Sequence, residues 1–407
     1  MKPLTGLTVV DFSKVLAGPL CAQYLGDLGA DVIKVEAYKD GDDTRRWPPF
    51  RGQDGTVFLS ANRNKRSIAL DLKSASGQEI ARKLVRTADI VVESFGPGVP
   101  KRLRIDHETV RRDNPRLIYC SISGFGRRGP MQNGKGYDVI LQAFSGMMSI
   151  TGEPDGPPSR SPFSPVDQAT GFHAVTGILA ALLDRERTGQ GALVETSLFD
   201  TSMSFLAYFL QGYWEKGTQP AKSGSGHESL CPYQAFQASD KYVLLGVAND
   251  ALWRRFCTLA SLEGIVDDPR FRTNADRVTN RAATVGMVQA VMVSRTCDEW
   301  VRVLGEAGIP AAPISSFADV TEHPHTKASG IIIEYEHTTH GRLKTVGQPI
   351  LFDGERNQPS SPPPMHGEHT TAILAGLGYS DADIGRLRDE KAIFVHAPAP
   401  APGQPPN

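Results

Sequence analysis

Residues 7–36, LTVVDFSKVLAGPLCAQYLGDLGADVIKVE, decide the fold class. The apolar run LTVVDF predicts a buried strand, PLCAQYLGDLG predicts a helix that ends at Gly29, and ADVIKVE predicts a second strand. A strand, a helix and a strand in this order form a βαβ unit with parallel strands.

The alternation of strands and helices continues along the first part of the chain. We expect a helix over 74–87, a strand at DIVVES, a polar helix before Asn114 and a strand at RLIYCSISGF. This order is typical of an α/β protein with a doubly wound parallel sheet, that is, of a Rossmann-like large domain.

The length of 407 residues implies more than one domain. We expect the linker to combine an amphipathic helix, running to about Lys216, with a loop rich in Gly, Ser and Pro. The predicted division is a large domain starting with 1–197, a linker at 198–232, a small α+β domain at 233–315, a linker and return to the large domain at 316–395, and a disordered Pro- and Ala-rich tail at 396–407.

Composition narrows the class of protein. The formal net charge is -1, so no basic field indicates nucleic-acid binding. The five cysteines are scattered without a C-x-x-C pair, which fits reduced thiols. The N-terminus lacks the apolar region of a signal peptide, and the apolar run VTGILAALL is shorter than a membrane span. We therefore expect a cytoplasmic protein that binds neither membranes nor nucleic acids.

Several familiar motifs are excluded. The turn SKVLAGPL lacks the glycines of a dinucleotide fingerprint, although it could be either a plain turn or the site of another nucleotide-like anion. The histidines of HGEHT are better explained as a helix start than as metal ligands, and no metal is predicted. The serines of SISGFG and SGSGH do not form a nucleophile elbow.

Asp167 is the carboxylate that needs an explanation. It lies in SPFSPVDQATGFHAVTGILAALL, residues 161–183, between a loop interrupted by prolines and a helix rich in small residues. An aspartate here could cap the helix. It could also be a nucleophile, since we expect the helix N-terminus to keep it ionised at neutral pH. The two roles use the same geometry, and the pattern alone leaves both open.

A family resemblance favours the chemical role. The segments LTGLTVVDFSKVLAGPLCAQYLGDLGADVIKVE, NRNKRSIALDLKS, VESFGPGVPKRL, SISGFGRRGP, GYDVILQAFSGMMSITG and VDQATGFHAVTGILAALLDRERTGQG occur in order. Together with PYQAF, GIPAAPI and GEHT, they resemble the family III CoA-transferases, the formyl-CoA transferase or CaiB/BaiF-like group. The resemblance extends over nearly the whole chain up to the tail.

The resemblance implies an enzyme that moves CoA between carboxylic acids, with Asp167 as a covalent nucleophile. It implies aspartyl anhydride and aspartyl-CoA thioester intermediates, acyl-CoA and a free acid as substrates, no permanently bound cofactor, and an interlocked ring homodimer. The residues it places at the CoA and substrate site are Lys14, Val15, Leu16, Leu70, Asp71, Leu72, Lys73, Phe95, Arg102, Lys135, Tyr137 and Asp138.

The chain departs from the formyl-CoA transferase pattern. Lys14 replaces a histidine, Leu16 a glutamine, Ala37 an arginine and Ser94 an asparagine. Lys73 or Arg102 must therefore carry more of the phosphate charge. The glycine-rich lid of that enzyme is reduced to SGSGH at 223–227.

The apolar Leu16 argues against formyl or oxalyl groups and favours a larger acyl pocket. We expect a donor such as succinyl-CoA and a small dicarboxylate acceptor of glutarate, malate, itaconate or mesaconate type. Arg45, Arg46 and Arg66 could pair with the distal carboxylate, or they could be surface charges or bind CoA phosphates.

Two other functions are considered. An α-methylacyl-CoA racemase resembles this family but needs a second base, usually the histidine of a GHD motif, where this chain has GYD with Tyr137. A phenol is a poor base for removing an α-proton at neutral pH, which favours CoA transfer. A non-catalytic CoA-binding protein would not require Asp167.

Overall fold

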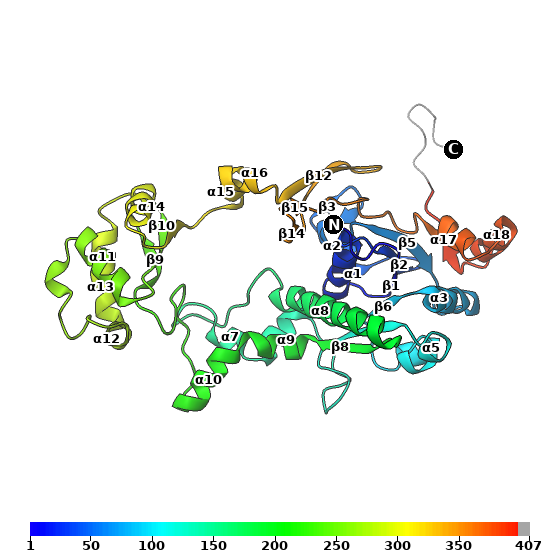
Figure 1. Ribbon diagram of the computed structural model, residues 1–407, viewed down its shortest axis with the longest axis horizontal. Helices are drawn as coiled ribbons and strands as arrows, with labels where there is room; N and C mark the ends of the chain where they lie inside the picture. The colour runs from blue at the N-terminus through cyan, green and yellow to red at the C-terminus, as the bar shows by residue number, and fades with distance from the viewer. Residues whose placement is uncertain (398–407) are drawn as a thin grey trace. The chain divides into compact units, whose positions relative to one another are not determined.

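The chain folds into two compact units. The structure, a computed structural model, describes residues 1–397 (Figure 1). Unit 1 comprises Met1–Ser145, Pro162–Ala207 and residues 325–397. Unit 2 comprises Gly146–Ser161 and Tyr208–Pro324.

A seven-stranded sheet organises unit 1, with the order β16-β5-β2-β1-β6-β7-β8. Neighbouring strands are parallel except for β16, which runs antiparallel to β5. After β1 the chain builds outward through β2 and β5 and then returns to the other side of β1 with β6, so the topological switch point lies between β1 and β6. The bounds are β1 (Thr8–Asp11), β2 (Asp31–Ala37), β5 (Lys65–Leu70), β6 (Ile90–Glu93), β7 (Ile118–Ser123), β8 (Leu193–Ser197) and β16 (Ile393–Phe394).

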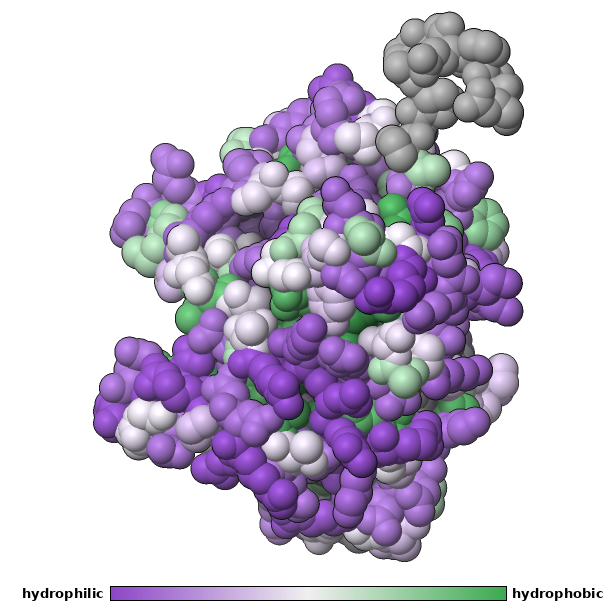
Figure 2. All heavy atoms as spheres, turned by 90° about the vertical axis from the view of Figure 1, so that its right-hand side faces the viewer, coloured by the Kyte–Doolittle hydropathy of each residue, from purple (hydrophilic) through white to green (hydrophobic). Residues whose placement is uncertain are grey.

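One face of the sheet is apolar. It packs against α3 (Ala75–Thr87), α5 (His107–Asp113), α17 (Thr370–Gly376) and α18 (Asp381–Asp389). Figure 2 shows the side of unit 1 on which α17 and α18 lie, where mainly hydrophilic side chains cover the surface and apolar ones are scattered. The strand residues in this core include Val10, Ile33, Val35, Ile68 and Leu70.

Charged side chains are buried at neighbouring strand positions. Because side chains alternate along a strand, Asp11, Lys34 and Lys65 point away from the apolar cluster, and each is at most 1% exposed. Two helices, α1 (Ala17–Asp27) and α8 (Pro165–Thr188), pack against each other and against strands of this sheet. Asp11, Lys34 and Lys65 therefore form a group of buried charges on the side of the sheet opposite the apolar cluster.

Glycines allow α1 and α8 to lie very close together. A Cβ atom on Gly171 of α8 would lie 2.7 Å from the carbonyl oxygen of Ala17, at the start of α1. A Cβ atom on Gly18 would lie 2.2 Å from the Cβ of Ser13. Both contacts are too short for any other residue, so the start of α1 lies directly against the second turn of α8 and against the turn that follows β1.

Helix α8 buries one stripe rather than its whole circumference. Val166, Thr170, Ala174 and Ile178 are buried, whereas Leu183 is 74% exposed. By length and hydropathy it is the one helix among residues 1–397 that could span a membrane. Its buried stripe packs against α1 and the sheet, as in the core helix of a globular protein.

The remaining elements of unit 1 are short. They connect the main strands or form small hairpins, such as the antiparallel pair β12 and β13. They are β3 (Phe50–Arg51), β4 (Asp54–Gly55), β12 (Ile332–His337), β13 (Gly341–Val346), β14 (Leu351–Phe352), β15 (Glu355–Arg356), the 3-10 helix η1 (Asp43–Arg46), α2 (Thr56–Ala61), α4 (Val99–Leu103), α6 (Asp138–Phe144) and α9 (Leu198–Phe205).

Unit 2 has its own core, in which a three-stranded antiparallel sheet packs against helices around Trp253, Phe256 and Trp300. Its strands are β9 (Tyr233–Gln237), β10 (Tyr242–Gly246) and β11 (Ala311–Pro313). Its helices are α7 (Met147–Ile150), α10 (Ala207–Lys216), α11 (Asp250–Leu259), the 3-10 helix η2 (Glu263–Ile265), α12 (Asn274–Thr279), α13 (Arg281–Met292), α14 (Cys297–Glu306) and α15 (Phe317–Glu322), with α16 (Pro324–Ser329) at the return to unit 1.

The observed boundaries differ in place from the predicted ones. The helix expected over 198–216 is interrupted at Leu206, and the division between the units falls directly after it, at Tyr208. Residues 146–161 group with unit 2, and the chain returns to unit 1 at His325, inside the segment 316–395 predicted as linker and return. Of the predicted tail, His396 donates its N–H to the carbonyl of Gly367, and 398–407 lie outside the described residues.

Candidate active site

A first cavity of about 340 Å³ opens at the carboxyl ends of β1, β6 and β7. This position is the topological switch point of the sheet, where open α/β folds bind their ligands. The cavity is lined by Lys14, Val15, Leu16, Ala17, Gly18, Ser94, Phe95, Gly96, Pro97, Ile122, Ser123, Gly124, Arg127, Gln132, Asn133, Gly134, Lys135, Gly136, Tyr137, Asp167 and Leu198.

A second cavity of about 530 Å³ also reaches Asp167. Val15, Leu16 and Asp167 line both cavities, so they form the boundary between them. The rest of the lining is mainly apolar or uncharged: Leu20, Gln23, Tyr24, Trp47, Val57, Ser60, Arg63, Pro162, Phe163, Ser164, Gln168, Thr345, Val346, Gly347 and Pro349. A larger cavity, of about 1360 Å³, belongs to unit 2 and is not lined by Asp167.

Asp167 is not the residue that caps its helix. Helix α8 begins at Pro165 after Ser164, whose side chain makes no capping bond. The capping acceptor comes from α6 instead. One carboxylate oxygen of Asp138, Oδ2, accepts the backbone N–H groups of Val166 at 2.8 Å and Asp167 at 3.1 Å. The side chain of Asp167 is therefore left to face the cavities.

The protonation of Asp167 differs from the sequence prediction. Burial, reinforced by the neighbouring charge of Asp138, raises the pKa of Asp167 to about 7. The N-terminus of a helix stabilises negative charge, but at α8 the carboxylate of Asp138, and not that of Asp167, accepts the N–H groups there. The expectation of full ionisation at neutral pH is therefore wrong. The raised pKa makes the ionised carboxylate more basic and hence a better nucleophile.

The first cavity brings together seven of the predicted site residues: Lys14, Val15, Leu16, Phe95, Lys135, Tyr137 and Asp167. Asp138 lies buried behind Asp167. The remaining predicted residues do not line this cavity. Leu70 is 1% exposed in the core, Leu72 packs against the same cluster, and Lys73 and Arg102 are exposed. Asp71, beside Leu70, accepts the N–H of Lys73.

Arg127 is a cavity residue that the sequence prediction missed. Its guanidinium donates to Ser121 Oγ at 2.9 Å, to the carbonyl of Phe95 at 3.0 Å and to Glu93 Oε1 at 2.9 Å. These bonds fasten it across the ends of β6 and β7. The available signal was its place in SISGFGRRGP, directly after a predicted strand.

The three arginines considered for a distal carboxylate lie elsewhere. Arg45 is buried in ion pairs with Glu36 and Asp54, Arg66 pairs with Asp31, and Arg46 pairs with two surface aspartates. None of the three lines either cavity. The prediction that they could bind the substrate carboxylate is therefore not supported by the geometry.

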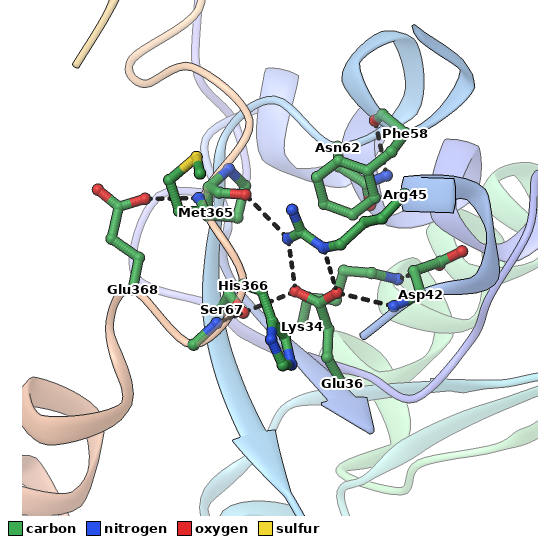
Figure 3. Close-up of polar contacts among 12 residues, drawn as sticks. Lys34, Glu36, Asp42, Arg45, Phe58, Asn62, Ser67, Met365, His366 and Glu368 are labelled. Carbon is green, nitrogen blue, oxygen red and sulfur yellow. Dashed lines mark hydrogen bonds and ion pairs between the residues drawn. The ribbon is translucent and has the colours of Figure 1, made fainter. Parts of the chain in front are cut away.

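The histidines of the HGEHT segment support the fold. His366 Nε2 hydrogen bonds to the carbonyl oxygen of Ala37 at 2.9 Å, and its ring stacks on Phe394. His369 accepts the N–H of Ser67 on β5 through Nδ1 at 3.3 Å. These bonds fasten the C-terminal segment to the sheet, on a side of unit 1 that Figure 3 shows in part.

Comparison with known proteins agrees with this architecture. The family described as "CoA-transferase family III" matches residues 4–370. A mouse protein named succinyl-CoA:glutarate CoA-transferase is 38% identical over 97% of this chain and 91% of its own length. An Agrobacterium fabrum protein named succinate–glutarate CoA-transferase is 37% identical, covering 92% of this chain and 96% of its own.

A solved structure has the same fold. The crystal structure of a CaiB/BaiF family protein from Brucella suis superposes with a TM-score of 0.81 at 38% identity, covering 92% of this chain and 99% of that one. Fold, site and relatives together define a CoA-transferase. The chain belongs to family III of these enzymes.

Proposed function

We propose that this enzyme transfers CoA from an acyl-CoA such as succinyl-CoA to a small dicarboxylate such as glutarate, with Asp167 as the covalent nucleophile. The observation that carries the proposal is the position of Asp167 at the boundary of two cavities. A carboxylate in this position can exchange a group between a ligand on one side and a ligand on the other.

The first half of the reaction releases the donor acid. A carboxylate oxygen of Asp167 attacks the thioester carbonyl carbon of the acyl-CoA, and the C–S bond breaks to give a mixed anhydride and CoA thiolate. The thiolate then attacks the aspartyl carbonyl of the anhydride. The donor acid leaves as its carboxylate, and Asp167 is left as a CoA thioester.

The second half repeats these steps with the acceptor. The acceptor carboxylate attacks the aspartyl-CoA thioester, which gives a new anhydride and CoA thiolate. The thiolate attacks the acceptor's carbonyl carbon, forms the new acyl-CoA and frees the Asp167 carboxylate. Each step exchanges one activated acyl group for another of similar energy, so no external energy source is needed.

The two cavities suit different parts of these substrates. The first has Lys135 as a cationic side chain, together with Lys14 and Arg127, which pair with Asp43 and Glu93, and Phe95 supplies an apolar wall. Phosphates and a pantetheine chain require this combination. The second cavity is uncharged apart from Asp167 and Arg63, whose guanidinium is already bound by Asp27 through two nitrogens. It suits the acyl group or the acceptor acid.

The preference for a dicarboxylate is supported by the relatives rather than by a free cation in the second cavity. The mouse and Agrobacterium proteins are both named for glutarate. Two uncharged donors, the hydroxyl of Tyr24 and the side-chain amide N–H of Gln23, can hydrogen bond to a distal carboxylate in this cavity.

A panel of acids tests the proposal. With succinyl-CoA as donor, we expect the kcat/KM for glutarate and related acids of four to six carbons to be at least tenfold higher than for acetate, benzoate or oxalate. The acyl-CoA products are separated and quantified by chromatography. Exclusive use of monocarboxylates would contradict the dicarboxylate preference and leave the transferase assignment intact. Epimerisation of a 2-methylacyl-CoA without CoA transfer would instead identify a racemase.

We further propose that the active form is the interlocked homodimer. Each unit leaves large apolar side chains exposed, such as Phe172 and Leu183 on α8 and Trp214 on α10, as subunit interfaces require. Sedimentation velocity at micromolar concentration should show a dimer. A monomer with full activity would contradict this.

The cytoplasmic location remains part of the proposal. It is supported by the five cysteines, which are all buried free thiols. Recovery of the protein in a secreted fraction would contradict it.

A further inference from the structure

Two buried ion pairs lie beneath the turn that follows β1. Lys34 Nζ lies 2.9 Å from Asp42 Oδ2, and Lys65 Nζ lies 2.9 Å from Asp11 Oδ2. All four side chains are at most 1% exposed. Replacing a buried ion pair by apolar residues is often neutral or stabilising, so its presence is weak evidence for a role in stability alone.

All four side chains bind the backbone of the turn or of the helix start that follows it. Asp11 Oδ1 accepts the N–H of Ser13 at 2.9 Å, and Lys34 Nζ donates to the Ser13 carbonyl at 2.9 Å. Asp42 Oδ1 accepts the N–H of Val15 at 3.3 Å. Lys65 Nζ donates to the carbonyl of Pro19, inside α1, at 2.8 Å.

Asp42 is itself held in place by Glu36 on β2. Its backbone N–H donates to Glu36 Oε2 at 2.9 Å, and Glu36 is bound by Arg45 and by Ser67 Oγ (Figure 3). Burial acts to raise the pKa of Asp42, but Lys34 and the Thr44 N–H outweigh it and hold this pKa below its usual range. The carboxylate that receives the Val15 N–H is therefore charged and fixed.

Val15 needs such a fixed acceptor because of its backbone conformation. Its φ of 72° lies in the left-handed region, which a β-branched residue adopts only when the surroundings impose it. The next residue, Leu16, and Val15 itself line both cavities beside Asp167. A relaxed Val15 would shift this shared wall.

We propose that Asp42, held by Lys34, is a positioning residue that keeps Val15 in its left-handed conformation and so sets the wall between the two cavities. The proposal rests on the proposed function of Asp167. Asp42 itself lines neither cavity. It affects the reaction only through its hydrogen bond to the backbone N–H of Val15.

The competing explanation is that Asp42 only stabilises the fold. Asp42 Oδ1 also accepts the N–H and hydroxyl of Thr44 at the start of η1, at 3.0 and 2.7 Å. Thr44→Val removes the hydroxyl bond and leaves the bond to Val15 untouched. It is therefore the control for an effect through η1 alone.

The test compares variants that leave no unpaired buried charge. Lys34→Met/Asp42→Asn keeps an acceptor oxygen for the Val15 N–H, whereas Lys34→Met/Asp42→Ala removes it. Both are made with Val15 and in a Val15→Gly background, because glycine adopts the left-handed conformation without strain. Folding is checked by thermal denaturation. Calorimetry measures the fraction of enzyme that binds CoA, and kcat is calculated per binding-competent enzyme.

We expect the Asp42→Ala pair to have a kcat at least tenfold lower than the Asp42→Asn pair, with KM changed less than threefold. In the Val15→Gly background this difference should fall below threefold, and Thr44→Val should stay within twofold of wild type. Equal kcat values for the two pairs, or the same loss in both backgrounds, would overturn the proposal.

Failure of the proposed function is a separate outcome. If the wild type binds CoA but transfers it to no acid, the function is wrong. The affinity for CoA then tests the positioning role, because Val15 and Leu16 also line the first cavity. A two- to threefold difference in Kd between the pairs, within the limit given above for KM, and its loss with Val15→Gly are then expected, and equal Kd values would overturn the positioning role.

Discussion

Asp167→Asn and Asp167→Ala are expected to lose CoA transfer by several orders of magnitude while keeping the wild-type melting temperature to within a few degrees. Both substitutions remove the carboxylate whose oxygen attacks the thioester and whose carbonyl carbon then carries CoA in the proposed reaction, so the anhydride route is closed. The helix should survive, because Asp138, and not Asp167, accepts the N–H groups at its start. Initial rates with succinyl-CoA and glutarate, followed by chromatography, measure the loss.

The covalent intermediate gives an independent measurement. Wild-type enzyme incubated with an acyl-CoA and quenched in acid should carry CoA or acyl on the peptide that contains Asp167, by mass spectrometry. Asp184→Asn is the matched control, since Asp184 is a solvent-exposed carboxylate on the same helix and pairs with Arg187. It should keep both turnover and the adduct. An adduct on another peptide, or turnover by Asp167→Ala, would contradict the mechanism.

The fold was largely predictable because the hydrophobic pattern of the first βαβ unit is unambiguous. Predicted strands and helices around 7–36, 74–93 and 118–123 correspond to β1, α1, β2, α3, β6 and β7. β5 was not predicted, because it begins with Lys65 and Arg66, and charged residues at a strand start obscure the apolar signal. The charge of Lys65 is compensated only by residues distant in sequence, such as Asp11.

The site was predictable only in part, because several of its contacts join residues that are distant in sequence. Asp167 was located by its place before a helix and by family resemblance, and residues in the turn after β1 follow from the strand order. The capping of α8 by Asp138 and the anchoring of Arg127 depend on contacts over 28 and 34 residues of sequence. Neither motif nor propensity encodes such contacts. The same holds for Asp42, whose partner Val15 is 27 residues away.

The reaction should lose activity below neutral pH. The pKa of Asp167 is raised to about 7, and only the ionised carboxylate attacks a thioester. The ionised fraction is therefore near its maximum above pH 8 and falls about tenfold for each unit below pH 7. Between the plateau and pH 5.5 we expect kcat/KM to fall roughly thirtyfold, whereas a carboxylate with an ordinary pKa near ~4 would lose almost nothing.

Asp138→Asn separates the causes of this pH dependence. The asparagine oxygen can still accept the N–H groups of α8, but the neighbouring negative charge is gone. Since burial is the larger cause of the raised pKa and Asp138 the smaller, the acid limb should move to lower pH without reaching the ordinary range of an aspartate. Gln142, whose amide contacts Asp138 Oδ1, can rotate to accept from the new amide. An unchanged limb would show that Asp138 does not influence the charge of Asp167. A wild-type profile flat from pH 5.5 to 8.5 would show that the nucleophile is ionised throughout, as an unshifted carboxylate would be.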